Sequence, residues 1–215
     1  MILLDGPLLV AYAVTAAATV ISPGPDTILI LRHALAGGPR PGLAAVAGVQ
    51  LGIVVHTAAA ALGLSLLIAS EPLLFRAIAV AGALYLGWLG YQGLRAGLLD
   101  PASLAGAVSV SRTRAARDAL ATNLLNPKVI VLFVALLPNF VRPELGQVWL
   151  QLAWLGLILI AINSAWQVML ALAADPIRRW LSRARVQRLV SWTTGAVLLA
   201  FAVGFLVEHV FAALA

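Results

Sequence analysis

The stretch Ser22-Pro23-Gly24-Pro25-Asp26 interrupts an apolar segment that runs from about residue 7 to residue 31. Asp26 is the one charged residue between Gly6 and Leu31. Proline lacks a backbone N–H, and in a helix its ring clashes with the carbonyl group four residues earlier. Two prolines that flank a flexible glycine therefore predict an unwound helix rather than a kinked one. Within a membrane, backbone groups that have lost their helical hydrogen bond are stable only where they face protein or a water-filled cavity. The fold must therefore place this break against other helices or against such a cavity.

The composition indicates an integral membrane protein. The 215 residues are 62% hydrophobic and 10% charged, with a mean hydropathy of +1.02. A soluble domain carries about 25% charged residues. Since the chain has no cysteine, disulfides and thiolate metal sites are excluded. No Lys or Arg precedes the first apolar run, which continues past any plausible cleavage site, so we expect a retained helix rather than a signal peptide.

Long apolar runs predict the membrane spans, because about 30 Å of hydrocarbon takes roughly 20 helical residues. They cover approximately residues 7–31, 43–69, 77–94, 119–141, 146–174 and 189–207. The fourth joins the short uncharged run 129–141 to the segment that precedes it. We therefore expect an all-α protein with six transmembrane helices in a single membrane domain, residues 1–215. Five spans plus a re-entrant segment is the alternative.

The basic residues predict the orientation. A polar segment at about 96–118 divides the chain into two halves, about 1–95 and 119–215. With six spans, the connections after spans one, three and five share one side of the membrane. They carry eleven of the fourteen Lys and Arg residues: Arg32, Arg40, Arg95, Arg112, Arg114, Arg117, Arg178, Arg179, Arg183, Arg185 and Arg188. By the positive-inside rule this side, with segment 96–118, is cytoplasmic, and both termini are non-cytoplasmic.

The net charge of +6 is explained by this insertion signal and by a basic face that attracts anionic membrane lipid. It carries no inference of nucleic-acid binding.

The second half repeats the break of the first. Pro25-Asp26 has a counterpart in Pro127-Lys128, within the sequence TNLLNPKVIVLF. Because each half holds three predicted spans, a second copy of the first half would be inserted upside down. The sequence thus predicts two inverted three-helix repeats, with helices one and four broken near the midplane, which is a known transporter plan.

The two breaks predict a central binding site. Restarting a helix leaves unpaired N–H groups and a partial positive charge at its start, and Asn126 followed by Pro127 is a favourable start signal. A charge near the bilayer centre costs on the order of 3 kcal/mol, so Asp26 and Lys128 need partners or water. A zwitterionic amino acid complements both. The alternatives are that Asp26 pairs with Lys128, or that Lys128 reaches an interface.

Four motifs run in order along nearly the whole chain: SPGPDTILILRHAL, GVQLGIVVHTAAAALGL, AGALYLGWLGYQGLR and NLLNPKVIVLFVALLPNFV. They resemble the motifs of the LysE/RhtB family of amino-acid exporters. The resemblance implies a multi-pass translocator of the bacterial inner membrane that exports amino acids or related small metabolites against protons, without ATP. Its central positions would be Pro23, Gly24, Pro25, Asp26, Asn126, Pro127 and Lys128.

Other polar residues fall inside the predicted spans. Gln50 and His56 on the second span are six residues apart, about 120° around a helix, and do not form one face. His56 could carry a proton near neutral pH, or simply bond a carbonyl group of a neighbouring helix. Asn163 and Gln167 share a face of the fifth span. They either contact the substrate or hold helices together.

The sequence therefore predicts a secondary active exporter of amino acids or related small metabolites, coupled to protons and needing no cofactor or metal. Asp26 would bind the substrate ammonium group or exchange it for a proton, with His56 as a reserve proton carrier. Enzyme motifs such as GxSxG, HExxH and the Walker loop are absent. A cation or metal-ion exporter and an accessory membrane subunit are the alternatives. Glycine-rich spans also allow a homodimer.

Overall fold

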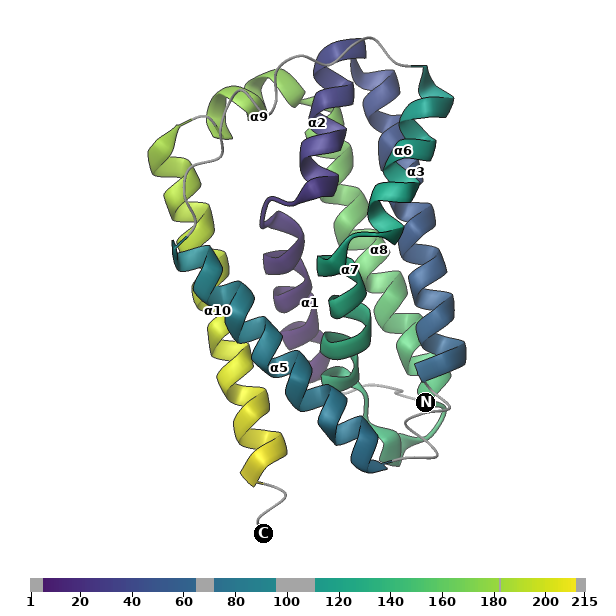
Figure 1. The fold of residues 1–215 in the computed structure, drawn as a ribbon, viewed down its shortest axis with the longest axis vertical. Helices are drawn as coiled ribbons and strands as arrows, with labels where there is room; N and C mark the ends of the chain where they lie inside the picture. The colour runs from purple at the N-terminus through teal and green to yellow at the C-terminus, as the bar shows by residue number, and fades with distance from the viewer. Residues whose placement is uncertain (1–5, 65–71, 96–110, 182, 212–215) are drawn as a thin grey trace.

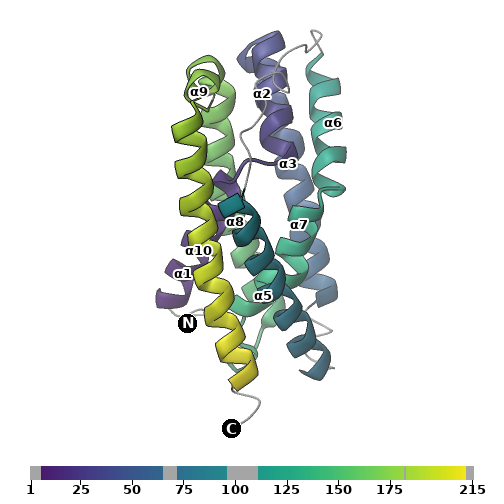
Figure 2. The same cartoon turned by 60° about the vertical axis from the view of Figure 1, so that its left-hand side comes forward.

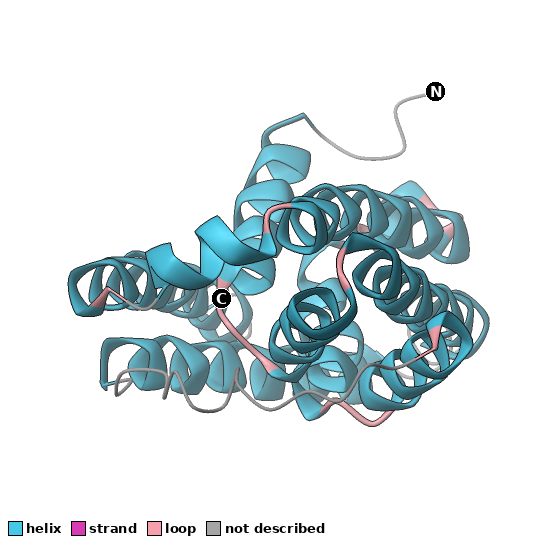
Figure 3. Ribbon diagram, turned by 90° about the horizontal axis from the view of Figure 1, so that it is seen from above, coloured by secondary structure: helices cyan, strands magenta, loops and turns pink. Residues whose placement is uncertain are grey.

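The computed structural model describes residues 6–64, 72–95, 111–181 and 183–211, and every regular element in these ranges is a helix (Figures 1 and 3). The first half of the chain forms α1 (Gly6–Ile21), α2 (Pro25–Gly37), α3 (Pro39–Ala59), the π-helical turn η1 (Ala60–Leu64) and α5 (Pro72–Arg95). The second half forms α6 (Arg112–Leu124), α7 (Pro127–Val131), η3 (Leu132–Leu136), η4 (Leu137–Phe140), η5 (Pro143–Leu145), α8 (Val148–Leu172), α9 (Ala174–Leu181) and α10 (Ala184–Phe211).

The structure has both breaks at the predicted positions. α1 and α2 meet at a bend of 54°, and α6 meets the helical segment Lys128–Phe140 at a bend of 53°. A proline stands in the first turn of both α2 and α7, where its missing N–H breaks no helical bond. The residues before the two prolines, Gly24 and Asn126, have extended backbone and cap the new helices. Proline chemistry thus produces the same bend twice.

Helix α6 begins before the expected start of the fourth span at Ala119. Ser111 caps it, because its hydroxyl oxygen accepts a 3.3 Å hydrogen bond from the backbone N–H of Arg114. Residues 112–118 are therefore helical, although the sequence places them in the polar segment 96–118. The remainder of that segment, 96–110, and the end of the predicted second span, 65–69, lie outside the described residues.

Small residues bring the helices close together. α3 packs along α6 and α8, and α5 packs along α10 (Figures 1 and 2). A Cβ atom at Gly48 would collide with the backbone carbonyl of Ala116, and one at Gly156 would collide with the side chain of Thr57. These glycines let the backbone of α3 approach α6 and that of α8 approach α3.

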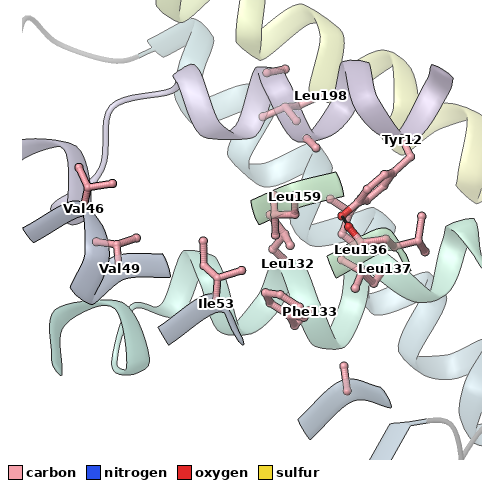
Figure 4. Packing of buried hydrophobic residues seen from close by; sticks show 14 of the residues in the cluster. Tyr12, Val46, Val49, Ile53, Leu132, Phe133, Leu136, Leu137, Leu159 and Leu198 are labelled. Atoms are coloured by element: carbon pink, nitrogen blue, oxygen red, sulfur yellow. Dashed lines mark hydrogen bonds between the residues drawn. The ribbon is translucent and has the colours of Figure 1, made fainter. Parts of the chain in front are cut away.

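The buried core fills the space between these helices (Figure 4). Tyr12 is fully buried in α1, donates a 2.9 Å hydrogen bond to the carbonyl oxygen of Leu155 and meets Phe140 edge to face. Phe140 in turn meets Phe205 of α10. Large apolar side chains such as Leu62 also stand exposed on the outside, which suits contact with lipid.

Three helical segments are long and apolar enough to cross a membrane: Pro39–Leu64, Val148–Leu172 and Ala184–Val207. With each bent pair counted as one span, the total is up to five. The chain is thus an all-helical membrane protein with three to five candidate spans among its described residues. α1 begins and α10 ends toward the same end of the molecule (Figure 1).

Candidate functional site

A cavity lies where the two breaks meet. Residues on both sides of each break line it, together with residues of α1, α3 and α8: Thr19, Val20, Ser22, Gly24, Asp26, Thr27, Ile53, Asn123, Asn126, Lys128, Val129, Leu132, Leu159, Asn163 and Gln167. Its volume is about 50 Å³, and roughly 10–15 Å³ is enough to hold one water molecule. The cavity therefore has space for a few water molecules, and a larger ligand requires its walls to move apart.

Asp26 and Asn123 form the acidic side of this cavity. The Asn123 side chain is fully buried, and its Nδ2 donates a 2.8 Å hydrogen bond to Oδ2 of Asp26. The other oxygens, Oδ1 of Asp26 and Oδ1 of Asn123, are buried and have no hydrogen-bond partner among the described residues. These two oxygens, one from the Asp26 carboxylate and one from the Asn123 amide, form a site for a cationic donor, because leaving buried acceptors unpaired is unfavourable.

Lys128 forms the basic side. Its Nζ donates a 2.8 Å hydrogen bond to the carbonyl oxygen of Ser22, at the break of the other bent pair. Asn126 supports it, because its Oδ1 accepts a 3.1 Å hydrogen bond from the Lys128 backbone N–H. No ion pair within 4.0 Å joins the described side chains of Asp26 and Lys128. Each charge is thus held by neutral groups rather than by the other charge.

The residues of the two proline motifs either line the cavity or shape the backbone beside it. Gly24, Asp26, Asn126 and Lys128 all line the cavity, whereas Pro23 and Pro25 shape the backbone at its edge. Pro127 starts α7.

His56 lies outside the cavity. It faces a separate groove lined by residues of α3, η1, α6, α7 and η3, and stacks on Phe133 with ring centroids 5.5 Å apart. Its Nε2 is 3.4 Å from the backbone carbonyl oxygen of Asn123, so one residue lies between His56 and Asp26.

Asn163 and Gln167 of α8 are both buried and both line the cavity. Gln50 of α3 contacts Gln167, a partner that its position in the sequence did not predict. Its Nε2 donates a 3.0 Å hydrogen bond to Oε1 of Gln167.

Sequence reasoning missed Asn123 and the backbone of Ser22. The signal for Asn123 was present, because an amide lies in an apolar stretch just before the second proline break. Nothing in the sequence indicates that Lys128 would reach Ser22, since that contact depends on how the two bent spans pack.

Comparison with known proteins identifies the family. The model of the LysE type translocator family matches residues 17–209. The chain belongs to the LysE-type translocators. This translocator is 32% identical to a homoserine/homoserine lactone efflux protein of Salmonella typhimurium, over 88% of its own length and 91% of the relative's. It is also 32% identical to the threonine efflux protein of Escherichia coli K12, over 87% of its own length and 90% of the relative's.

A leucine efflux protein of Klebsiella pneumoniae is 29% identical to this LysE-type translocator, over 89% of its length and 91% of the relative's. No solved structure matches it. All three of these relatives are named as efflux proteins. The family assignment confirms the resemblance that the proline motifs carry.

Proposed function

We propose that this translocator is a secondary active exporter of amino acids or related small metabolites across the bacterial inner membrane, coupled to protons. The observation that carries the proposal is that one cavity has the hydrogen-bonded Asp26 and Asn123 on one side and Lys128 on another side. The relatives named as efflux proteins for homoserine, threonine and leucine support the same substrate class.

The substrate ammonium group would bind at Asp26 and Asn123. Oδ1 of each residue lacks a partner among the described residues, so a single –NH₃⁺ group could donate to both. The Asn123–Asp26 bond keeps these two acceptors together. A charge-assisted hydrogen bond of this kind is roughly twice as strong as one between neutral groups.

The substrate carboxylate would bind near Lys128 and the start of α2. Nζ of Lys128 can offer two further N–H donors beyond its bond to Ser22. α2 begins beside it at Pro25, and the first turn of a helix presents unpaired N–H groups and a partial positive charge. The ideal Cβ position of Gly24 is 3.8 Å from Nζ of Lys128, so a larger residue would occupy this space.

Proton coupling would arise at Asp26. When the substrate leaves toward the outside, a proton would neutralise the carboxylate before the empty site returns, because an isolated charge is costly at membrane depth. His56 remains a reserve carrier, since its Nε2 is 3.4 Å from the backbone carbonyl oxygen of Asn123, the residue that bonds Asp26.

Transport would require the two halves of the chain to move against each other. The cavity is too small for an amino acid in this conformation, so binding needs an open state. We propose six spans in two inverted repeats, with α5 as the span that completes the first repeat. The bends of 54° and 53°, and the packing of α3 on α8 and of α5 on α10, support a two-fold relation between the halves.

The proposal is tested by efflux from cells loaded with dipeptides that release single amino acids. Asp26→Asn should reduce export of every exported amino acid to the background of cells that lack the protein, while the variant still accumulates in the membrane. Glu144→Gln is the matched control, since it removes an exposed acid outside the cavity. Full export by Asp26→Asn would exclude Asp26 as the ammonium site. Altered tolerance to a divalent cation, with amino-acid efflux at background throughout, would favour a cation exporter.

A further inference from the structure

The cavity also has a neutral polar wall, formed by Asn163 and Gln167 of α8. We propose that these two amides, with Gln50 of α3 behind them, form a subsite that selects substrates whose side chain is uncharged and able to accept a hydrogen bond. This inference rests on the proposed function, because it concerns the part of the amino acid that Asp26, Asn123 and Lys128 do not hold.

Both amides are buried within reach of a ligand. Asn163 is 6% exposed and Gln167 is 3% exposed. They are spaced i, i+4 and therefore lie on one face of α8. Asn163 lines the cavity, and no hydrogen bond of its side chain to another described residue is found. An amide that lines a cavity bonds water there, and a substrate with a polar side chain can take the place of that water.

Gln50 sets the direction of the Gln167 amide. Its Nε2 donates to Oε1 of Gln167 at 3.0 Å, which occupies the oxygen of Gln167 and leaves its –NH₂ group available. Gln50 is not among the residues that line the cavity, so it acts through Gln167 as a positioning residue. The subsite therefore presents the –NH₂ groups of Gln167 and Asn163 as donors and Oδ1 of Asn163 as an acceptor, and this set suits a hydroxyl group on the substrate.

The surrounding walls limit what the side chain can be. Ile53 and Leu159 are apolar, and the hydroxyl of Thr19 already donates to the carbonyl oxygen of Thr15. The charged side chains that line the cavity are Asp26 and Lys128, and the backbone charges of the substrate engage both. A charged substrate side chain would thus find no counter-ion among the residues that line the cavity.

Threonine and valine are the best pair of probes for this subsite, because they have nearly the same shape and a hydroxyl group of threonine takes the place of a methyl group of valine. A site that hydrogen-bonds a hydroxyl group rejects the analogue that lacks it far more strongly than an apolar pocket rejects an added hydroxyl. An apolar pocket in the same place would take valine at least as well as threonine.

The test is exchange of labelled threonine in vesicles that contain the purified full-length protein, with unlabelled threonine or valine as competitor. The wild type should prefer threonine over valine by about tenfold or more. Asn163→Leu and Gln167→Leu should bring this ratio toward one, and Gln50→Leu should lower it by a smaller factor. Gln92→Leu is the matched control, because Gln92 is exposed on α5 and its replacement should leave the ratio unchanged.

Three results would overturn the proposal, and they separate it from the proposed function. If the leucine variants weaken threonine and valine exchange equally, the amides only hold helices together. If the wild type exchanges threonine and valine equally well, the subsite is wrong but the exporter remains. If no amino acid is exchanged and Asp26→Asn changes nothing, the subsite and the proposed function fail together.

Discussion

The side-chain amide of Asn123 donates a 2.8 Å hydrogen bond to the carboxylate of Asp26, and this bond joins the two broken spans. Asp26 lies in the first turn of α2, and Asn123 lies in the last turn of α6. Gly52 of α3 provides the space for the amide, because a Cβ atom there would collide with Oδ1 of Asn123. The acidic side of the cavity therefore depends on the consecutive helices α2 and α3 and on α6 from the second half of the chain.

Gly52→Ala should weaken export by displacing Asn123 without changing any charged residue. Loss of a hydrogen bond to a charged group costs about 1.5–3 kcal/mol, which corresponds to roughly a tenfold or greater fall in substrate affinity. The apparent substrate affinity should be measured from the dependence of efflux on substrate concentration, at equal amounts of protein in the membrane. Gly204→Ala is the control, since a Cβ at Gly204 meets nothing within 4 Å. Unchanged affinity in Gly52→Ala would show that Asn123 does not position the site.

Lys128→Met should destabilise the protein as well as stop export. The substitution removes the ammonium group that binds the part-buried Ser22 carbonyl oxygen, and an acceptor that loses its partner costs up to about 1–3 kcal/mol. A protein of this size loses roughly 2–4 °C in melting temperature per kcal/mol. Thermal unfolding in detergent should therefore show a drop of several degrees, whereas Arg185→Met, at an exposed position, should show none. An unchanged melting temperature in Lys128→Met would mean that Lys128 serves the substrate alone.

The sequence was sufficient to predict the breaks, because their cause is local. Proline removes the N–H group wherever it stands, so the ends of α1 and α6 follow from the positions of Pro23, Pro25 and Pro127. Asp26 and Lys128 could be placed near one another because both adjoin a break. The start of α6 was harder, since a polar segment rich in arginine reads as a loop until Ser111 is recognised as a cap.

The partners within the site could not be predicted, because they depend on side-chain packing between helices. Gln50 and His56 point in different directions around α3, as the helical spacing requires. Gln50 meets Gln167 on α8, whereas His56 turns toward α6 and Phe133. A helical period fixes which residues share a face, but not which neighbouring helix lies against that face.

Proton coupling predicts that an inward proton gradient accelerates export. In vesicles loaded with threonine, an acidic exterior should speed efflux, and a protonophore should remove the acceleration. Asp26→Asn should make any residual efflux insensitive to the gradient, since the amide cannot bind and release the proton. His56→Gln separates the two candidates. If His56→Gln loses the gradient response and Asp26→Asn keeps it, His56 is the coupling residue. A wild-type rate that ignores the gradient would contradict proton coupling itself.

The orientation can be tested by cysteine labelling, because the chain has no cysteine of its own. α2 ends, α3 and α6 begin, and α9 lies at the upper end of the molecule in Figure 1. These helices carry Arg40, Arg112, Arg178 and Arg179. Ala184→Cys lies just after α9, and Glu144→Cys lies in η5 between α7 and α8; both positions are exposed. A membrane-impermeant maleimide added to intact cells should label Glu144→Cys and spare Ala184→Cys, with the reverse in inside-out vesicles. Labelling of both positions from one side would exclude a membrane crossing by α8 and the proposed six-span topology with it.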